Sequence, residues 1–343
     1  QTNFNIKYNN LLFFKNLLNS NKSEHKINFV NSKLFYIDKN EEVVFFSYIK
    51  NLDFLYNEKF AQELLAKLKI FNTSLKLNIV NNLQEKKTST KINSHKLRLN
   101  IENNFEYNDK SKKGVLKFKI FNKSIKIKYK LNNNSLVFNS DKSNILGDIN
   151  FKPFYLSTSV RLEQLDVLKI LKNDSILINI FNSELLSNQN LNAKVDIYSK
   201  SIRGIKYLNN IKLKAYFEEG NILIKDSNIN WKDSVNINLE NIKLTNQNGK
   251  IIIAGVISFD FIDLNSFYRH YQIVKVDRKK IEKIKLNFDY NLNENKIDIN
   301  NLKTDGAKSK IIDNFLINFN IKKKDLSSNV VFKNLIKEFF SIL

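Results

Sequence analysis

The chain has 343 residues and a formal net charge of +22 at pH 7, and 42% of its residues are hydrophobic. It has no cysteine, which excludes disulfide bonds and thiolate metal sites. One proline and seven glycines set it apart from collagen-like chains and from flexible linkers. The length suits one large β domain or two smaller ones.

Lysine supplies nearly all of the positive charge. Nucleic-acid readers favour arginine for bidentate contacts, and the arginines here are few: Arg98, Arg161, Arg203, Arg269 and Arg278. The lysines are spread along the polar faces of expected strands, as at Lys117 and Lys119. Two interpretations stay open: compositional drift onto solvated faces, and attraction to anionic surfaces such as phospholipid headgroups.

The first 70 residues mix expected helices and strands. Apolar spacing within residues 1–20 fits a short amphipathic helix, and strands are expected at residues 27–29, 33–37 and 43–49. A second helix is predicted over residues 57–68, because Phe60, Leu64 and Leu68 share a helical face and Asn57 is a suitable N-cap.

Apolar and polar residues then alternate with period two over much of the chain. Successive side chains of a strand point to opposite faces, so each such run predicts a strand with one apolar and one polar face. Strands dominate from residue 73 to about 152. The alternation is clearest at Leu97–Ile101, Leu116–Ile120, Ile125–Tyr129, Val235–Leu239 and Ile284–Tyr290.

The second half repeats this rhythm with helical interruptions. A helix is predicted around Val160–Leu171, residues 176–186 read as strand or helix, and strands return from Leu191 to Phe261. Leu264–Val274 reads as a short aromatic helix, two or three strands follow, and Val330–Leu343 reads as an apolar helix or strand. Short Asn-rich turns between strands favour meandering antiparallel pairing.

Domain boundaries are weakly marked. The single proline, Pro153, is the one candidate boundary. We therefore expect a β-rich part at residues 1–152, which includes the helix near 57–68, and a second β part at residues 153–343. The alternative is one continuous domain. The chain begins at Gln1, so we expect a piece of something longer, from which a signal peptide or membrane anchor could have been removed. No apolar run reaches the roughly 18–20 residues that a membrane helix needs.

The sequence carries no recognisable catalytic or cofactor motif. It lacks a nucleophile elbow, a Walker-type loop and a dinucleotide-binding glycine turn. The histidines, His25, His95 and His270, have no partners at metal-ligand spacing. We therefore expect no catalytic residues, no metal site, no cofactor and no enzyme activity. For Trp231, the single tryptophan, packing at a strand end is favoured over a ligand or membrane contact.

One stretch, residues 201–261, carries more than composition. Gly220 precedes Ile222 and Ile224 in one expected strand, and Gly255 lies between Ile253 and Ile257 in a later one. This succession resembles the C-terminal repeat region of the AsmA-like family of Gram-negative envelope proteins, which are related to TamB-type lipid transfer proteins. Residues 26–78 are similar to the N-terminal side of such domains.

The resemblance implies a mainly β fold in which a long, curved antiparallel sheet with a few short helices forms an open groove lined by apolar residues. It implies a non-enzymatic, periplasmic protein, anchored to the inner membrane by a segment outside this chain. Its role would be phospholipid transport between the inner and outer membranes or outer-membrane assembly, with phospholipid acyl chains as ligands and outer-membrane or envelope proteins as further partners. The expected acyl-chain contacts are Ile222, Ile224, Val235, Ile237, Leu239, Ile251, Ile253, Ile257 and Phe259.

Two other hypotheses stay open. A structural or adhesive secreted β domain would have the same strands but a filled core. Nucleic-acid binding would need lysines gathered with exposed aromatic residues on one face, and it ranks last because the lysines are dispersed.

Overall fold

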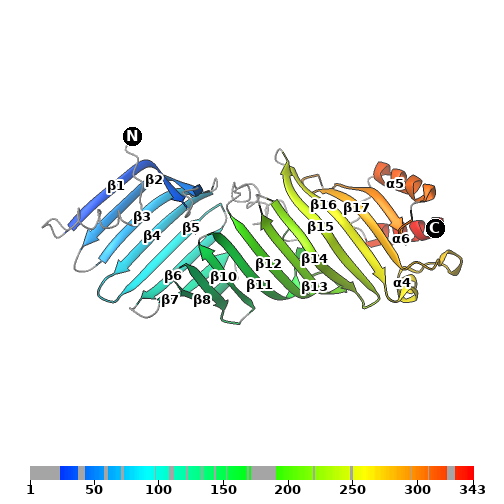
Figure 1. The fold of residues 1–343 in the computed structure, drawn as a ribbon, viewed down its shortest axis with the longest axis horizontal. Helices are drawn as coiled ribbons and strands as arrows, with labels where there is room; N and C mark the ends of the chain where they lie inside the picture. The colour runs from blue at the N-terminus through cyan, green and yellow to red at the C-terminus, as the bar shows by residue number, and fades with distance from the viewer. Residues whose placement is uncertain are drawn as a thin grey trace. The chain divides into compact units, whose positions relative to one another are not determined.

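The computed structural model describes residues 24–343 apart from short gaps, which are residues 38–42, 58–60, 71–72, 97, 108–111, 121–122, 133, 143, 152, 168–169, 171–190, 219–220, 248–249, 295, 308 and 323–328. Within these residues the chain is mainly β, and its 18 strands belong to one open sheet (Figure 1). The chain divides into two compact units, residues 1–143 with 148–153, and residues 144–147 with 154–343. Each unit is described by itself.

The first unit is a ladder in which consecutive strands pair antiparallel from β1 to β9. The strands of this ladder are β1 Glu24–Ile37, β2 Val43–Asn57, β3 Ala61–Ile70, β4 Thr73–Asn82, β5 Lys87–Ser94, β6 Leu99–Tyr107, β7 Lys112–Ile120, β8 Lys123–Leu131 and β9 Ser135–Ser140. The end of β10 (Ile145–Phe151) joins β9, where the Phe151 amide donates to the Asn134 carbonyl. The two strands expected at residues 27–29 and 33–37 are both strand but form one continuous element, β1, and the strand expected at residues 43–49 is confirmed within β2.

The second unit continues the strand pattern from β11 to β18. β11 and β12 pair parallel, which departs from the all-antiparallel expectation, and each later strand pairs antiparallel with the next. The strands are β11 Phe154–Leu165, β12 Asn192–Ile202, β13 Ile205–Glu218, β14 Asn221–Trp231, β15 Val235–Gln247, β16 Lys250–Phe261, β17 Lys283–Asn291 and β18 Lys296–Thr304.

The helices of the second unit contribute apolar side chains to one cluster with its last strands. They are α4 (Leu264–Tyr271), the 3-10 turn η1 (Lys275–Asp277), α5 (Lys310–Lys322) and α6 (Asn329–Ile342). The predicted aromatic helix is confirmed as α4, whose N-cap Asp263 accepts a hydrogen bond from the Ser266 amide. The C-terminal segment, residues 330–343, was expected to be a helix or a strand, and it forms the helix α6. α5 was not anticipated from the sequence.

The helix predicted over residues 57–68 is wrong. Residue 57 ends β2, and residues 61–70 form β3, paired on both sides with β2 and β4. The segment carries both periods: Leu64, Leu65 and Leu68 suit a helix, whereas Leu64, Ala66 and Leu68 alternate as in a strand. Strand pairing determines the outcome, because β2 and β4 satisfy the backbone hydrogen-bonding groups of residues 61–70 on both sides. Leu65 then lies on the other face of the sheet, where it remains 41% exposed.

The helix predicted around residues 160–171 is wrong in its first half. β11 runs through to Leu165, because β12 supplies a parallel ladder along it. Helical backbone is assigned at Val167 and Ile170, and the Ile170 amide donates to the Asp166 carbonyl. The predictions for residues 1–20 and 176–186, and the residue Gly220, lie outside the described residues.

Bulges interrupt the strands at asparagine and aspartate residues with left-handed backbone. Asn210, Asp226 and Asn241 have φ of 48°, 46° and 51° and lie at shifts in the registers of β13, β14 and β15. Asn31 in β1 has φ of 50°. Short polar side chains tolerate this conformation better than other non-glycine residues, and an extra residue bends its strand and increases the twist.

Candidate apolar binding surface

One face of the first unit carries a continuous row of apolar residues. The register places one residue from each of β1 to β8 side by side, and every member is apolar. At about 4.8 Å between strands, the row is about 34 Å long. We call it the central apolar row: Phe29, Leu52, Ala66, Leu77, Ile92, Ile101, Phe118 and Ile125.

The central apolar row is only half-covered. Among the described residues of the first unit, the buried hydrophobic side chains are Ile49 and Ala66, and the other row members are half-buried. The three clusters of buried hydrophobic residues all lie in the second unit. The described part of the first unit is therefore a single layer whose apolar side chains stay in reach of a ligand.

A neighbouring row widens this surface and is interrupted by polar groups. It contains Ile27, Phe54, Leu64, Ile79, Thr90, Asn103, Leu116 and Ile127. The Tyr129 hydroxyl donates to Asn103 Oδ1 at 2.8 Å, and burial raises the pKa of Tyr129. The Tyr129 ring stacks on Phe105, with an interplanar angle of 4°, and Gly114 lies between them in the register.

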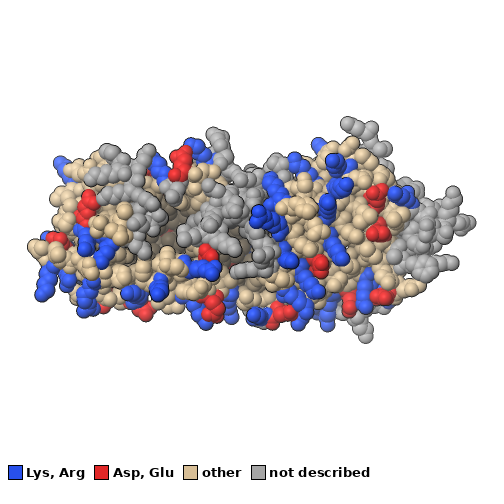
Figure 2. Space-filling view, turned by 180° about the vertical axis from the view of Figure 1, so that it is seen from behind, with Lys and Arg blue, Asp and Glu red and all other residues tan. Residues whose placement is uncertain are grey.

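The opposite face of the same strands is polar and rich in lysine. Lys117, opposite Lys126 in the ladder, is one of many exposed lysines there. Asp141 forms ion pairs with Lys126 and Lys128 at 3.8 and 3.2 Å. In the face shown in Figure 2, basic side chains recur along the molecule with acidic side chains among them.

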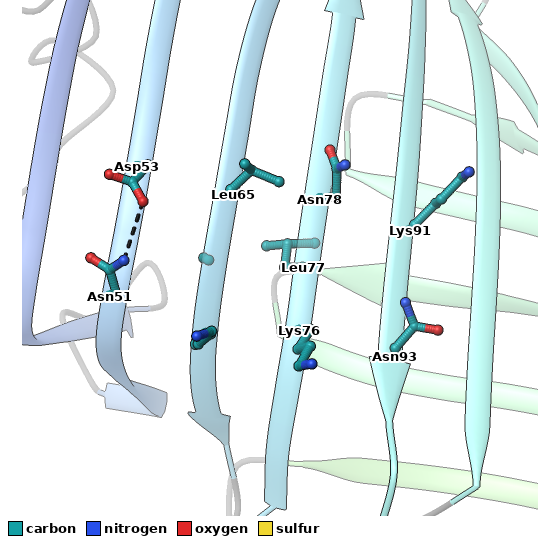
Figure 3. A pocket seen from close by; sticks show the side chains of 10 residues that line it. Asn51, Asp53, Leu65, Lys76, Leu77, Asn78, Lys91 and Asn93 are labelled. Atoms are coloured by element: carbon teal, nitrogen blue, oxygen red, sulfur yellow. Dashed lines mark hydrogen bonds between the residues drawn. The ribbon is translucent and has the colours of Figure 1, made fainter.

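An open hollow of about 340 Å³ lies among β2 to β5. Ten residues line it, as Figure 3 shows: Asn51, Asp53, Leu65, Ala66, Lys67, Lys76, Leu77, Asn78, Lys91 and Asn93. Asp53 accepts hydrogen bonds from Asn28 and Asn51, and these bonds, with the Lys26 ammonium 3.6 Å away, hold its pKa below the ordinary value.

In the second unit, the strand registers place the nine expected acyl-chain contacts on one face of the sheet. Ile222 is paired with Leu244 and Leu244 with Ile253, while Ile237 is paired with Phe259. The same alternation places Ile251 and Ile253 together, with Ile252 on the other face. The full set on the apolar face is Ile222, Ile224, Val235, Ile237, Leu239, Ile251, Ile253, Ile257 and Phe259.

These nine residues divide between two clusters. Val235, Ile237 and Phe259 pack in the helix-capped cluster, together with side chains of α4, α5 and α6 such as Phe267 and Phe340. The other six, Ile222, Ile224, Leu239, Ile251, Ile253 and Ile257, pack in the strand cluster, which contains strand residues and Leu292. Helix side chains occupy the space beside the first group, whereas no described helix contributes to the second.

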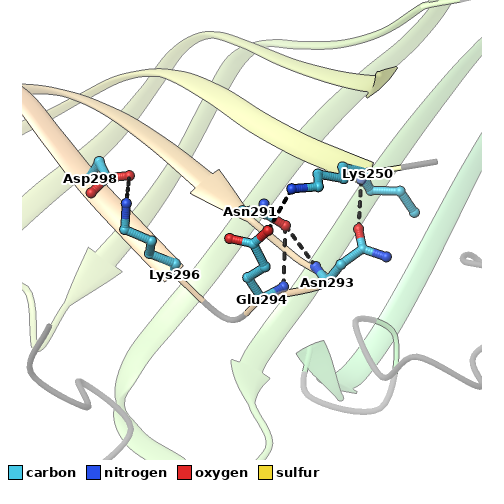
Figure 4. A network of polar contacts seen from close by, with 7 residues as sticks. Lys250, Asn291, Asn293, Glu294, Lys296 and Asp298 are labelled. Atoms are coloured by element: carbon cyan, nitrogen blue, oxygen red, sulfur yellow. Dashed lines mark hydrogen bonds and ion pairs between the residues drawn. The ribbon is translucent and has the colours of Figure 1, made fainter. Parts of the chain in front are cut away.

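A polar network fastens the β17–β18 turn at the end of the strand cluster (Figure 4). The Leu292 amide donates to the Ile251 carbonyl, and Asn293 Oδ1 accepts from the Ile251 amide at 2.7 Å. Lys250 Nζ pairs with Glu294 at 2.7 Å, and this ammonium lowers the pKa of Glu294. The turn thereby holds the buried Leu292 against the strand cluster.

Trp231 packs in the helix-capped cluster, as expected. It is 3% exposed and contacts Phe267 and His270 edge-on. Lys232 Nζ lies 3.3 Å from His270 Nδ1, and burial, together with the Lys232 and Lys333 charges, lowers the pKa of His270. These contacts make Trp231 part of a packed aromatic core.

The described residues contain no group of three His, Cys, Asp or Glu side chains placed to hold a metal ion. None of the helices seen in the described ranges has the length and apolarity required to cross a bilayer.

Comparisons with protein-family models, with curated proteins and with solved structures find no match to this chain. The described fold therefore defines its class: a mainly β protein built on an open 18-stranded sheet, whose first unit has one apolar and one polar face.

Sequence reasoning missed the central apolar row as a candidate site. The alternation at residues 97–101, 116–120 and 125–129 predicted an apolar face for each strand, but the site was placed in residues 222–259, where the resemblance lies. The row could have been found from the regular alternation across residues 43–131 together with the short turns. Short turns favour pairing between consecutive strands, and such pairing aligns their apolar residues on one face.

Proposed function

We propose that this chain is a non-enzymatic lipid-binding protein whose ligand is a phospholipid acyl chain. The single observation that carries the proposal is the central apolar row, in which eight consecutive strands present apolar side chains that, apart from the buried Ala66, remain half-exposed. Burying a methylene group contributes about 0.8 kcal/mol, so a chain laid along the row gains affinity with each carbon.

Within the second unit, the proposed lipid contacts are the half-buried residues of the strand cluster, which are Ile224, Leu239, Ile253 and Ile257. Ile222 and Ile251 are 3% and 1% exposed and are assigned to the core of that cluster. Val235, Ile237 and Phe259 are assigned to core packing, because helix side chains fill the space beside them. The bulges at Asn210, Asp226 and Asn241 support a sheet that curves toward its apolar face as an open groove.

The biological setting follows from the resemblance of residues 201–261 to the AsmA-like family. We propose a periplasmic role in phospholipid transport between the inner and outer membranes, or in outer-membrane homeostasis. The lack of a catalytic motif in the sequence and the strand-built apolar surface agree with a carrier.

The proposal is tested by native mass spectrometry and lipid extraction of the purified chain. We expect phospholipid to co-purify with the wild type. Ile101→Glu places a charge in the central apolar row and should reduce the bound lipid at least about tenfold, because a buried unpaired carboxylate opposes an apolar ligand. A wild-type protein free of lipid after mild purification overturns the proposal.

The matched control is Val80→Glu. Val80 is in β4 on the opposite face, where it is 36% exposed and pairs with Glu63 and Ser89. This variant should retain lipid. If both variants lose lipid equally while staying folded by circular dichroism, lipid binding does not occur at the central apolar row.

The second candidate function is a structural or adhesive domain with a filled core. The helix-capped cluster favours it for that part of the second unit, since α4, α5 and α6 pack there. It predicts that Leu77→Glu and Ile101→Glu unfold the first unit with no lipid to lose.

A further inference from the structure

The polar face of the first unit contains an aromatic exception. Phe35, Phe46 and Tyr48 are 51%, 46% and 37% exposed, on a face where lysine and asparagine prevail. The register pairs Phe35 with Phe46 and Tyr48 with Lys33 on one side. On the other side, Tyr48 pairs with Lys69. We call these five residues the aromatic–lysine patch.

Contacts within the patch hold its aromatic rings in place. The Phe35 and Phe46 ring centroids are 6.0 Å apart. Lys33 Nζ lies 6.0 Å from the centroid of the Phe46 ring, and the Tyr48 hydroxyl lies 3.4 Å from Asn31 Oδ1. A fixed group of exposed rings beside ammonium groups loses little conformational freedom when it binds a surface.

Further lysines extend the patch along the same face. Lys67 lies two residues before Lys69 on β3 and pairs directly with Lys76 on β4. These two side chains, with Lys91, line the hollow of Figure 3. None of the three lysines forms an ion pair with another described residue. Like charges placed directly opposite in a ladder are unfavourable unless an anion neutralises them.

The hollow also offers a hydrogen-bond acceptor. Asn78 Oδ1 is buried there and accepts no hydrogen bond from the described residues. It is suited to a hydroxyl or ammonium donor of the ligand. Phosphate oxygens beside the lysines, and such a donor beside Asn78, match the headgroup of a phospholipid.

We propose that this face of β1 to β4 docks on the surface of an anionic phospholipid bilayer. The aromatic–lysine patch sits at the level of the headgroups, with the rings toward the acyl boundary. Lys67, Lys69 and Lys76 contact lipid phosphates. Aromatic rings flanked by lysine are typical of protein surfaces at the membrane interface, where an apolar body meets a charged layer.

The bilayer-docking face is distinct from the acyl-chain surface. The central apolar row lies on the other side of the same strands, because side chains alternate between faces. The docking proposal does not rest on acyl-chain binding, and each can fail without the other.

The test is co-sedimentation of the full chain with vesicles of phosphatidylcholine, with or without phosphatidylglycerol. We expect binding that requires phosphatidylglycerol and weakens as salt rises. The double variant Lys67→Gln/Lys69→Gln should lower the partition coefficient by about tenfold or more, since each lysine near an anionic surface contributes about a fivefold factor.

The matched control is Lys117→Gln/Lys119→Gln, which removes the same charge from the same face on β7. It should change binding by less than half as much on a logarithmic scale. The triple variant Phe35→Ser/Phe46→Ser/Tyr48→Ser should also weaken binding, and its side chains are exposed, so the fold should persist by circular dichroism.

Three results overturn the docking proposal: no vesicle binding by the wild type, equal loss from the two lysine pairs, or full binding by the folded aromatic variant. Ile101→Glu separates the two proposals, because it should release co-purified lipid and leave vesicle binding intact. Binding of inorganic phosphate by a chain that does not bind vesicles would identify a soluble phosphate ligand and would also overturn docking.

Discussion

The ring of Tyr129 lies directly over Gly114 of the neighbouring strand. A β-carbon on Gly114 would be 2.2 Å from Tyr129 Cζ and 2.3 Å from the hydroxyl oxygen, well inside the contact limit. The missing side chain thus lets the ring cover the strand, stack on Phe105 and reach Asn103. The absence of a side chain at Gly114 leaves room for the Tyr129 ring on the apolar face.

Gly114→Ala should therefore destabilise the first unit by about 1–3 kcal/mol, because the new methyl group displaces Tyr129 from its stack and hydrogen bond. Urea unfolding followed by circular dichroism measures this. A double-mutant cycle with Tyr129→Ala provides the control: the alanine substitution at residue 114 should cost much less once the ring is gone. Additive costs would show that the ring is not displaced.

Gly255 occupies a different kind of close contact. A β-carbon there would be 2.7 Å from the Ile242 Cα, which is backbone, beside the bulge at Asn241. Gly255→Ala should cost about 1–3 kcal/mol or more, since a strand has to move. At Gly204, φ is +82° and a β-carbon meets nothing within 4 Å, so Gly204→Asn should stay near wild type. Equal costs at the two sites, measured by thermal unfolding, would falsify this contrast.

The bulge at Asn241 gives a prediction that distinguishes two substitutions. Its φ of 51° strains a residue with an ordinary side chain. Asn241→Ala should destabilise the second unit by about 1 kcal/mol, whereas Asn241→Gly should be neutral or nearly so. If alanine and glycine have the same effect in chemical denaturation, the backbone at residue 241 does not adopt the left-handed conformation.

Alkaline pH should weaken the helix-capped cluster through Tyr268. Its hydroxyl donates to the Lys279 carbonyl, and burial raises its pKa to about 12 from an ordinary 10. The folded chain therefore holds this proton more tightly than the unfolded chain. The stabilisation is complete below pH 10 and is lost as pH rises from about 10 toward 12.

Tyr268→Phe should cost about 1 kcal/mol at pH 7, from the lost hydrogen bond, and the gap to the wild type should narrow above pH 10. Urea midpoints at pH 7 and pH 11 measure both effects. Tyr271, whose pKa is also raised by burial, titrates alike in both proteins and cancels in the comparison. A gap that is constant with pH would exclude Tyr268 as the titrating group.

Local alternation was sufficient to predict most strands and the class of fold. The strands at residues 116–120, 125–129, 235–239 and 284–290 are found where the pattern places them. The alternation did not predict the strand within residues 57–68, because the apolar pattern that includes Leu64 and Leu65 fits both a helix and a strand. Only the pairing with β2 and β4 shows that this segment is a strand. The parallel β11–β12 pair was also missed, because its connection leaves no local signal in either strand.

The candidate site was harder to predict, because it depends on register. Each strand contributes one residue to the central apolar row, and no local motif marks Leu77 or Ile101 as neighbours of Ile92. The same holds for the aromatic–lysine patch, in which the β1–β2 register pairs Lys33 with Tyr48 and Phe35 with Phe46.

The central apolar row also carries an evolutionary consequence. Since every strand adds one side chain, inserting a hairpin of the same alternation would lengthen the row by about 10 Å and leave all existing pairs but one intact. A hairpin has two strands, so strand direction and facing are preserved beyond the insertion. Duplication of such units is a route by which a chain of this kind could be matched to a longer span without a new fold.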